Sequence, residues 1–172
     1  MEERPVFVTS DGDEIAVRPI TPDDAPALVD FHEHLSAETV YLRFFSSHTH
    51  LRPAEVERFT HVDGHNRFAV VAEHEGGMVA VARYDRLAEP TTAEVAFVVA
   101  DAWQHHGIGS FLLRVLAGAA EANGISELVA EVLMGNRTML AVFSESGLPM
   151  RHREADGTVE VRLSLEPARD GD

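Results

Sequence analysis

Two residue types that enzymes often use in catalysis are absent from this sequence of 172 residues. All 14 basic residues are Arg, so the chain has no Lys, and it has no Cys either. These absences exclude Schiff-base catalysis by a lysine, a cysteine nucleophile, thiolate metal sites and disulfides. The remaining composition, with 45% hydrophobic and 25% charged residues, is typical of a folded domain.

Positive charge is scarce as well. The formal net charge is −15 at pH 7 and the isoelectric point is about 4.9, so nucleic acids and anionic membranes would be repelled, whereas an amine-bearing partner would not. The first residues do not form a basic segment followed by an apolar one, and no stretch approaches about 18 uninterrupted apolar residues. We therefore expect a cytoplasmic protein with neither a nucleic-acid nor a membrane partner. The oligomeric state is not predicted.

The order of sequence patterns predicts the fold class. No repeat or linker divides the chain, which indicates one domain over residues 1–167 and a short disordered tail over residues 168–172. Helices are expected at residues 21–35, 37–45, 53–61, 107–123 and 136–146. Strands are expected at residues 6–9, 15–18, 67–72, 78–84, 92–100 and 127–134, and in a last pair that ends at residues 159–163. This order predicts an α/β (α+β) domain with a mixed sheet.

A strand, a loop with two glycines and an apolar helix follow one another between Ala93 and Leu113. The first N–H groups of a helix lack internal partners and lie at the positive end of its dipole, so they can bind phosphate oxygens. Gly107 and Gly109 have no Cβ and let a ligand approach the backbone closely. A P-loop is excluded because it needs a Lys, and the dinucleotide-binding motif lacks its third glycine at Leu112. A tight turn without any ligand is the simpler alternative.

The loop itself carries a family resemblance. Gln104-His105-His106-Gly107-Ile108-Gly109 resembles the Q/R-x-x-G-x-G/A loop that binds the acetyl-CoA pyrophosphate in the GNAT superfamily of N-acetyltransferases. The order of elements from about residue 14 to residue 165 fits that fold, a mostly antiparallel sheet with helices on both faces that splays around the acetyl-CoA site. More narrowly, residues 36–45 and 93–99 resemble the catalytic domain of actinobacterial protein lysine acetyltransferases.

The resemblance implies a set of site residues, with acetyl-CoA as co-substrate and no metal. Tyr41 and Arg43 lie in the segment that this family places over the acceptor, although simple packing would also explain them. Ten His residues form no metal-binding pattern such as His-Glu-x-x-His. The residues expected at acetyl-CoA are Val98 and Val99 along the pantetheine arm, Gln104, His105, His106, Gly107, Ile108, Gly109 and Ser110 around the pyrophosphate, and Asn136 beside the departing sulfur.

Glu94 is the catalytic candidate. Alternation along the strand places Glu94 on one face with Ala96 and Val98. A carboxylate within an otherwise apolar strand is costly unless it is hydrogen-bonded or neutralised, and such a site favours a general base that works near neutral pH. The resembling family has a glutamate base here that acts through water. The alternative is that Glu94 simply lies at the exposed start of its strand.

Phe143 departs from the family pattern, in which many members have Tyr as the acid that protonates the coenzyme A thiolate. Phe has no proton to donate, but an ordinary thiol has a pKa near 8.5, so its thiolate can leave without an acid. Ser144 or water could replace the acid. The missing acid could instead mean slow or lost catalysis.

These observations predict an acetyl-CoA-dependent N-acetyltransferase with a protein lysine as first acceptor. Direct transfer is expected, because a chain without Cys cannot form an acetyl-cysteine intermediate. The alternatives are a small-molecule amine or a protein N-terminus as acceptor, or a non-catalytic acyl-CoA-binding regulatory module. Negative charge is expected to collect at the acceptor face, away from the phosphate loop.

Overall fold

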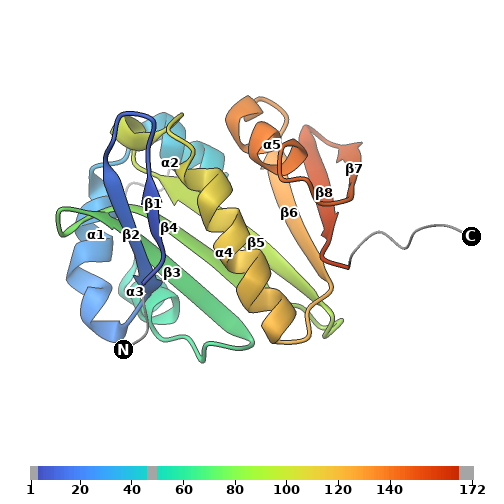
Figure 1. Cartoon of the computed structure of the whole chain (residues 1–172), viewed down its shortest axis with the longest axis horizontal. Helices are drawn as coiled ribbons and strands as arrows, with labels where there is room; N and C mark the ends of the chain where they lie inside the picture. The colour runs from blue at the N-terminus through green and yellow to red at the C-terminus, as the bar shows by residue number, and fades with distance from the viewer. Residues whose placement is uncertain (1–3, 46–49, 167–172) are drawn as a thin grey trace, which may run out of the picture.

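The computed structural model describes residues 4–45 and 50–166, so the predicted tail at residues 168–172 lies outside the described residues. Its centre is an eight-stranded sheet in the order β1-β2-β3-β4-β5-β6-β8-β7 (Figure 1). All neighbouring strands run antiparallel except β5 and β6. The strands are β1 (Val6–Val8), β2 (Glu14–Pro19), β3 (Arg67–His74), β4 (Gly77–Arg86), β5 (Thr92–Val99), β6 (Glu127–Leu133), β7 (Met150–Ala155) and β8 (Thr158–Ser164). The expected mixed α/β fold is confirmed.

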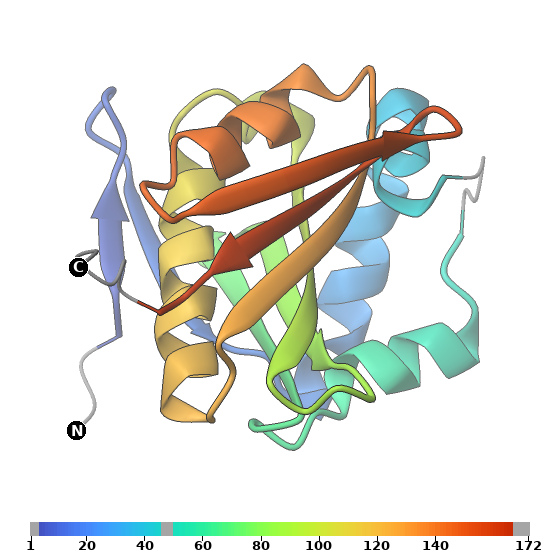
Figure 2. The same ribbon diagram turned by 90° about the vertical axis from the view of Figure 1, so that its right-hand side faces the viewer.

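Helices cover both faces of the sheet. The helices are α1 (Ala25–Glu33), α2 (Ala37–Phe44), α3 (Pro53–Thr60), α4 (Ile108–Ala122) and α5 (Arg137–Ser144), with short 3-10 turns η1 (Pro22–Asp24) and η2 (Asp101–Trp103). On one face, Leu112 and Leu116 of α4 pack against Phe97. On the other, Leu28 and Phe31 of α1 pack in one cluster with Val81. Figures 1 and 2 show α5 beside α4, above β6 and β8.

Alternation divides the side chains of β5 as the sequence predicts. Val95 and Phe97 belong to the core under α4, whereas Val98 packs against the cluster under α1. We call the second side the Glu94 face, because Glu94 and Ala96 share it with Val98. The fold therefore separates one apolar face of β5 from one that carries a carboxylate.

The sheet opens between β5 and β6. These strands pair only over three residues, from Thr92 with Glu127 to Glu94 with Val129, and then separate. On its other side β5 stays paired with β4 along its whole length. The hydrogen bond from Ala100 N to Val79 O, 2.8 Å, shows that the even-numbered residues at this end of β5 bond to β4. The main-chain groups of Phe97 and Val99 consequently face the opening.

Candidate active site

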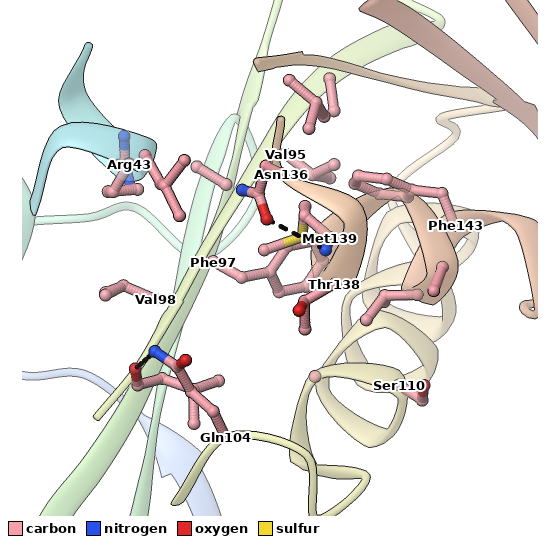
Figure 3. A pocket seen from close by; sticks show the side chains of 18 of the residues that line it. Arg43, Val95, Phe97, Val98, Gln104, Ser110, Asn136, Thr138, Met139 and Phe143 are labelled. Carbon is pink, nitrogen blue, oxygen red and sulfur yellow. Dashed lines mark hydrogen bonds between the residues drawn. The ribbon is translucent and has the colours of Figure 1, made fainter. Parts of the chain in front are cut away.

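A cavity of about 680 Å³ lies where β5 and β6 separate, bounded by α2, the start of α4 and α5. Figure 3 shows Arg43 on one side of β5, Thr138, Met139 and Phe143 on the other, and Gln104 near the end of the strand. The sequence-predicted residues that line it are Arg43, Glu94, Val98, Val99, Gln104, His105, Gly107, Ile108, Gly109, Ser110 and Asn136. His106 and Tyr41 are not among the lining residues. The tertiary structure thus gathers most of the predicted site in one place.

Two glycines of the loop lie so close to other side chains that a larger residue at either position would disturb the packing. Gly107 is the N-cap of α4 and has φ +85°. A Cβ on Gly107 would lie 3.1 Å from Phe7 Cζ, and one on Gly109 would lie 3.3 Å from Val142 Cγ2. Gly109 therefore has a packing role between α4 and α5 as well as a place in the loop. The free N–H groups at the start of α4 open onto the cavity and can receive phosphate oxygens.

Two side chains of the loop are engaged with the protein. Gln104 Nε2 donates to Val99 O at 3.1 Å and to Thr39 Oγ1 at 3.2 Å. His106 lies against the β1–β2 hairpin, with Nδ1 3.4 Å from Asp11 Oδ2. Gln104 is a structural link at one end of the cavity, and the side chain of His106 is turned away from the place where the sequence expected a cofactor contact.

Val98 and Val99 play different parts in the strand. The main chain of Val98 pairs with Val81 of β4, so its N–H and C=O groups are used within the sheet. Val99 has its main-chain groups on the open side, although its carbonyl already accepts the Gln104 hydrogen bond. Sequence reasoning named both residues for main-chain binding; the ladder leaves Val99 and the neighbouring Phe97 for that role.

Glu94 lines the cavity from the position that alternation predicts, but its side chain is exposed. The cost of burying a carboxylate, on which the sequence argument relied, therefore does not arise. Asp85 lies directly opposite on β4 and is paired with Arg67 at 3.0 Å. In the part of the chain that the structure describes, the side chain of Glu94 has no hydrogen bond or ion pair and is available to a ligand.

Cationic side chains lie on the Glu94 face together with Glu94 and Asp85, where the sequence predicted that negative charge would collect. Arg83 is only 6% exposed, donates to Phe59 O at 3.2 Å and stacks on the Phe59 ring at 4.2 Å. Burial and the neighbouring Arg43 charge lower the pKa of Arg83. Burial lowers the pKa of Arg43 as well, opposed by the attraction of Glu94 and Asp85. Two positively charged side chains, Arg43 and Arg83, thus lie on the same face of the sheet as the candidate base.

Helix α5 supplies the remaining polar groups. Asn136 caps the helix, its Oδ1 accepting from Met139 N at 3.2 Å, which leaves its amide N–H groups for the cavity. Phe143 is 1% exposed and packs on Phe97 with ring centroids 5.9 Å apart. Ser144 donates to Ala141 O at 3.2 Å and does not line the cavity, so it is not placed to replace the missing acid.

Sequence reasoning missed several residues of the cavity. Thr138, Arg137 and Glu131 line it, and the hydroxyl of Thr138 lies among the central side chains in Figure 3. Helical spacing after Asn136 could have suggested Thr138, but Glu131 comes from β6, which reaches the site only through the opening of the sheet. Within residues 4–45 and 50–166, no group of three His, Asp or Glu side chains could hold a metal ion. Across the same residues, every helix is too short or too polar to cross a bilayer.

Comparisons with known proteins agree with this geometry. The sequence profile of the acetyltransferase (GNAT) family matches residues 28–148. The chain is 33% identical over 159 residues to acetyltransferase Pat of Mycolicibacterium smegmatis, covering 91% of this chain and 47% of Pat. The crystal structure of the GNAT domain of S. lividans PAT superposes with a TM-score of 0.88 and 39% identity, covering 94% of this chain and 96% of that one.

A more distant structure shares only the fold. The Salmonella typhimurium protein yncA, solved with its cofactor acetyl-CoA, matches with a TM-score of 0.74 and 17% identity over 92% of this chain and 98% of that one. The family profile and the likeness to Pat show that the chain belongs to the acetyltransferase (GNAT) family. Within the family it is similar to the GNAT domain of Pat, and it spans about half the length of the mycobacterial protein.

Proposed function

We propose that this protein transfers an acetyl group from acetyl-CoA directly to an amine, with a protein lysine as the first acceptor to test. One observation carries the proposal: a single cavity in the opened sheet joins an unpaired carboxylate, Glu94, to the glycine loop at the start of α4. The family and the likeness to Pat support the reaction class and the acceptor.

The residues expected at the cofactor can form hydrogen bonds to three parts of acetyl-CoA: the pyrophosphate, the pantetheine arm and the thioester. The main chain from His105 to Ser110 offers N–H groups to the pyrophosphate. The open edge of β5 at Val99 offers main-chain hydrogen bonds to the pantetheine amides, and its N–H groups can polarise the thioester carbonyl. Asn136 can donate from its amide beside the sulfur. His106, whose side chain faces Asp11, contributes through its main chain.

The chemical step requires a neutral amine and a leaving thiolate. Glu94, acting through water, removes a proton from the incoming ammonium, and the amine nitrogen attacks the thioester carbonyl. When the tetrahedral intermediate collapses, the carbon–sulfur bond breaks, the nitrogen loses its second proton to solvent, and coenzyme A leaves as a thiolate, which solvent protonates because Phe143 cannot. The amine keeps the acetyl group as an amide.

Helix α2 forms the acceptor side of the cavity. Arg43 lines the cavity on the Glu94 face and is a candidate contact for the acceptor, whereas Tyr41 stands outside the cavity and is half exposed. A small amine or a protein N-terminus would meet the same groups. Phe143 in place of an acid favours a second candidate, a module that binds acyl-CoA without turnover.

Thiol release separates these candidates. Purified protein is mixed with acetyl-CoA and either a lysine-rich protein, a panel of small amines or buffer, while a thermal shift reports acetyl-CoA binding. Release that depends on the lysine-rich protein, with acetyl-lysine found in it by mass spectrometry, supports the proposal. Because this chain has no Lys, its own side chains cannot contribute acetyl-lysine. Binding without release over the whole panel would support the non-catalytic module, and no binding would exclude both.

A further inference from the structure

Asp101 connects the cofactor side of the cavity to the helix on its acceptor side. It begins η2, between β5 and the glycine loop. Its carboxylate accepts hydrogen bonds from Ser36 N at 2.9 Å, Ser36 Oγ at 2.6 Å and Thr39 Oγ1 at 2.7 Å. Ser36 is the N-cap of α2, so one side chain of η2 holds the first turn of a helix that lies 62 to 65 residues earlier in the sequence.

Gln104 extends this connection into the loop. Its Nε2 donates both to Thr39 Oγ1 and to Val99 O. Thr39 is 8% exposed, and its hydroxyl donates to Asp101 while it accepts from Gln104. The first turn of α2, the end of β5 and the start of the glycine loop are therefore linked by one hydrogen-bond network.

The charge on Asp101 strengthens the network. Burial acts to raise the pKa of Asp101, but the hydrogen bonds from Ser36 and Thr39 outweigh it and hold this pKa below its usual range. The carboxylate also lies at the N-terminus of α2, where negative charge is favoured by the helix dipole. Hydrogen bonds to an ionised group are about twice as strong as neutral ones.

Helix α2 has few other anchors. Its buried residues are Thr39 and Val40, and at its other end the Phe44 ring lies edge-on to His32 of α1, with ring centroids 5.3 Å apart. The same helix carries Leu42 and Arg43 into the cavity wall, and Phe45 follows at its C-cap. Displacing its first turn would therefore move the side chains that face the acceptor without touching the start of α4.

We propose that Asp101 is a positioning residue that fixes α2, and with it the acceptor side of the cavity, against the cofactor loop. This inference rests on the proposed function. Through their hydrogen bonds, Asp101, Thr39 and Gln104 make acceptor binding depend on the conformation of the glycine loop. By linkage, a ligand that orders the loop must then favour acceptor binding, and an acceptor must favour that ligand to the same degree.

Two variants and a matched control test the assignment. Asp101→Ala removes the carboxylate, and Thr39→Val removes the bridging hydroxyl at nearly constant volume. Thr39→Ser keeps the hydroxyl and serves as the control. We expect the acceptor KM to rise about tenfold in Asp101→Ala and Thr39→Val, as for the loss of a charge-assisted hydrogen bond. The dissociation constant of acetyl-CoA should change less than about twofold, and Thr39→Ser should resemble the wild type.

Hydrogen exchange of the amides provides a readout that needs no turnover. In both disruptive variants, the α2 amides should exchange about tenfold faster than in the wild type, whereas those of α4 should not change. Retained acetyl-CoA binding shows that the variants fold. Unchanged α2 exchange, or a loss of acetyl-CoA affinity, measured without acceptor, that equals the loss for the acceptor, would overturn the inference. If the wild type shows no turnover, the proposed function fails, while the exchange experiment still decides the role of Asp101.

Discussion

Asp85 and Glu94 face each other across the β4–β5 ladder, and both side chains project from the same face of the sheet. Cβ atoms of such a directly opposed pair lie about 5 Å apart, a distance at which two carboxylates repel. Arg67 pairs with Asp85 at 3.0 Å and neutralises it. Glu94 is therefore the carboxylate of this pair that stays available to the cavity, which is the physical basis for assigning it as the base.

Replacing Glu94 by Gln removes the proton acceptor and keeps the size of the side chain. We expect kcat to fall about 10²- to 10⁴-fold at neutral pH, the usual effect of losing a general base. Acetyl-CoA binding should be retained. Glu131→Gln is the matched control, because Glu131 is also an exposed strand glutamate that lines the cavity. A kcat near that of the wild type at every pH in Glu94→Gln would remove Glu94 from the mechanism.

Arg43 is half-buried, and its partly desolvated charge lies near a buried cation, Arg83. Arg43→Met keeps the packing of the stem and removes the charge, so we expect the unfolding free energy to rise by about 0.5–1 kcal/mol. Thermal unfolding should occur about 1–4 °C higher, while kcat/KM for the acceptor falls. Arg43→Lys keeps the charge and should show no such gain. A lower melting temperature for Arg43→Met would show that the guanidinium stabilises the fold.

Gly107 and Gly118 should respond to alanine in opposite directions. Gly107 has φ +85°, and a Cβ there would lie 3.1 Å from Phe7 Cζ. Gly107→Ala should lower the unfolding free energy by about 1–3 kcal/mol and raise the KM for acetyl-CoA. Gly118 is exposed within α4 and a Cβ there meets nothing within 4 Å, so Gly118→Ala should stabilise by about 0.5–1 kcal/mol. Urea unfolding measures both, and equal effects would contradict this account.

Because of Asp63, the free energy of unfolding is expected to depend on pH in the acid range. It accepts main-chain hydrogen bonds from His65, Asn66 and Arg67 at 2.8–2.9 Å. Those bonds, led by the one from Arg67, lower the pKa of Asp63 from 3.8 to about 2. Since the folded pKa lies below the unfolded one, its stabilisation is present above about pH 4 and is lost as the pH falls towards 2.

Asp63→Asn should therefore be less stable than the wild type at pH 7 and equally stable near pH 2. Because the side chain is exposed and screened by solvent, we expect a difference of about 0.5–1 kcal/mol at pH 7. Urea unfolding at several pH values measures it. A difference that persists unchanged at pH 2 would mean that Asn disturbs the turn in another way.

Local patterns in the sequence predicted the strands and helices well because each has its own period and its own end signals. Alternation placed Glu94 with Ala96 and Val98, and the glycines marked the start of α4. The same patterns left open whether Glu94 is buried or lies at an exposed strand start, and the structure shows it exposed. They also could not reveal Asp101, whose partners lie 62 to 65 residues away in the sequence.

By itself, the sequence determined the chemistry that is possible. Without Cys there can be no acetyl-enzyme on a thiol, and without Lys there is no side chain for the protein to acetylate on itself. Only the tertiary structure decided how the site is made. The parting of β5 from β6 opens the cavity and exposes the main chain of Val99, and the packing of α2 brings Arg43 beside Glu94. Such features arise from contacts between distant segments, which no local pattern encodes.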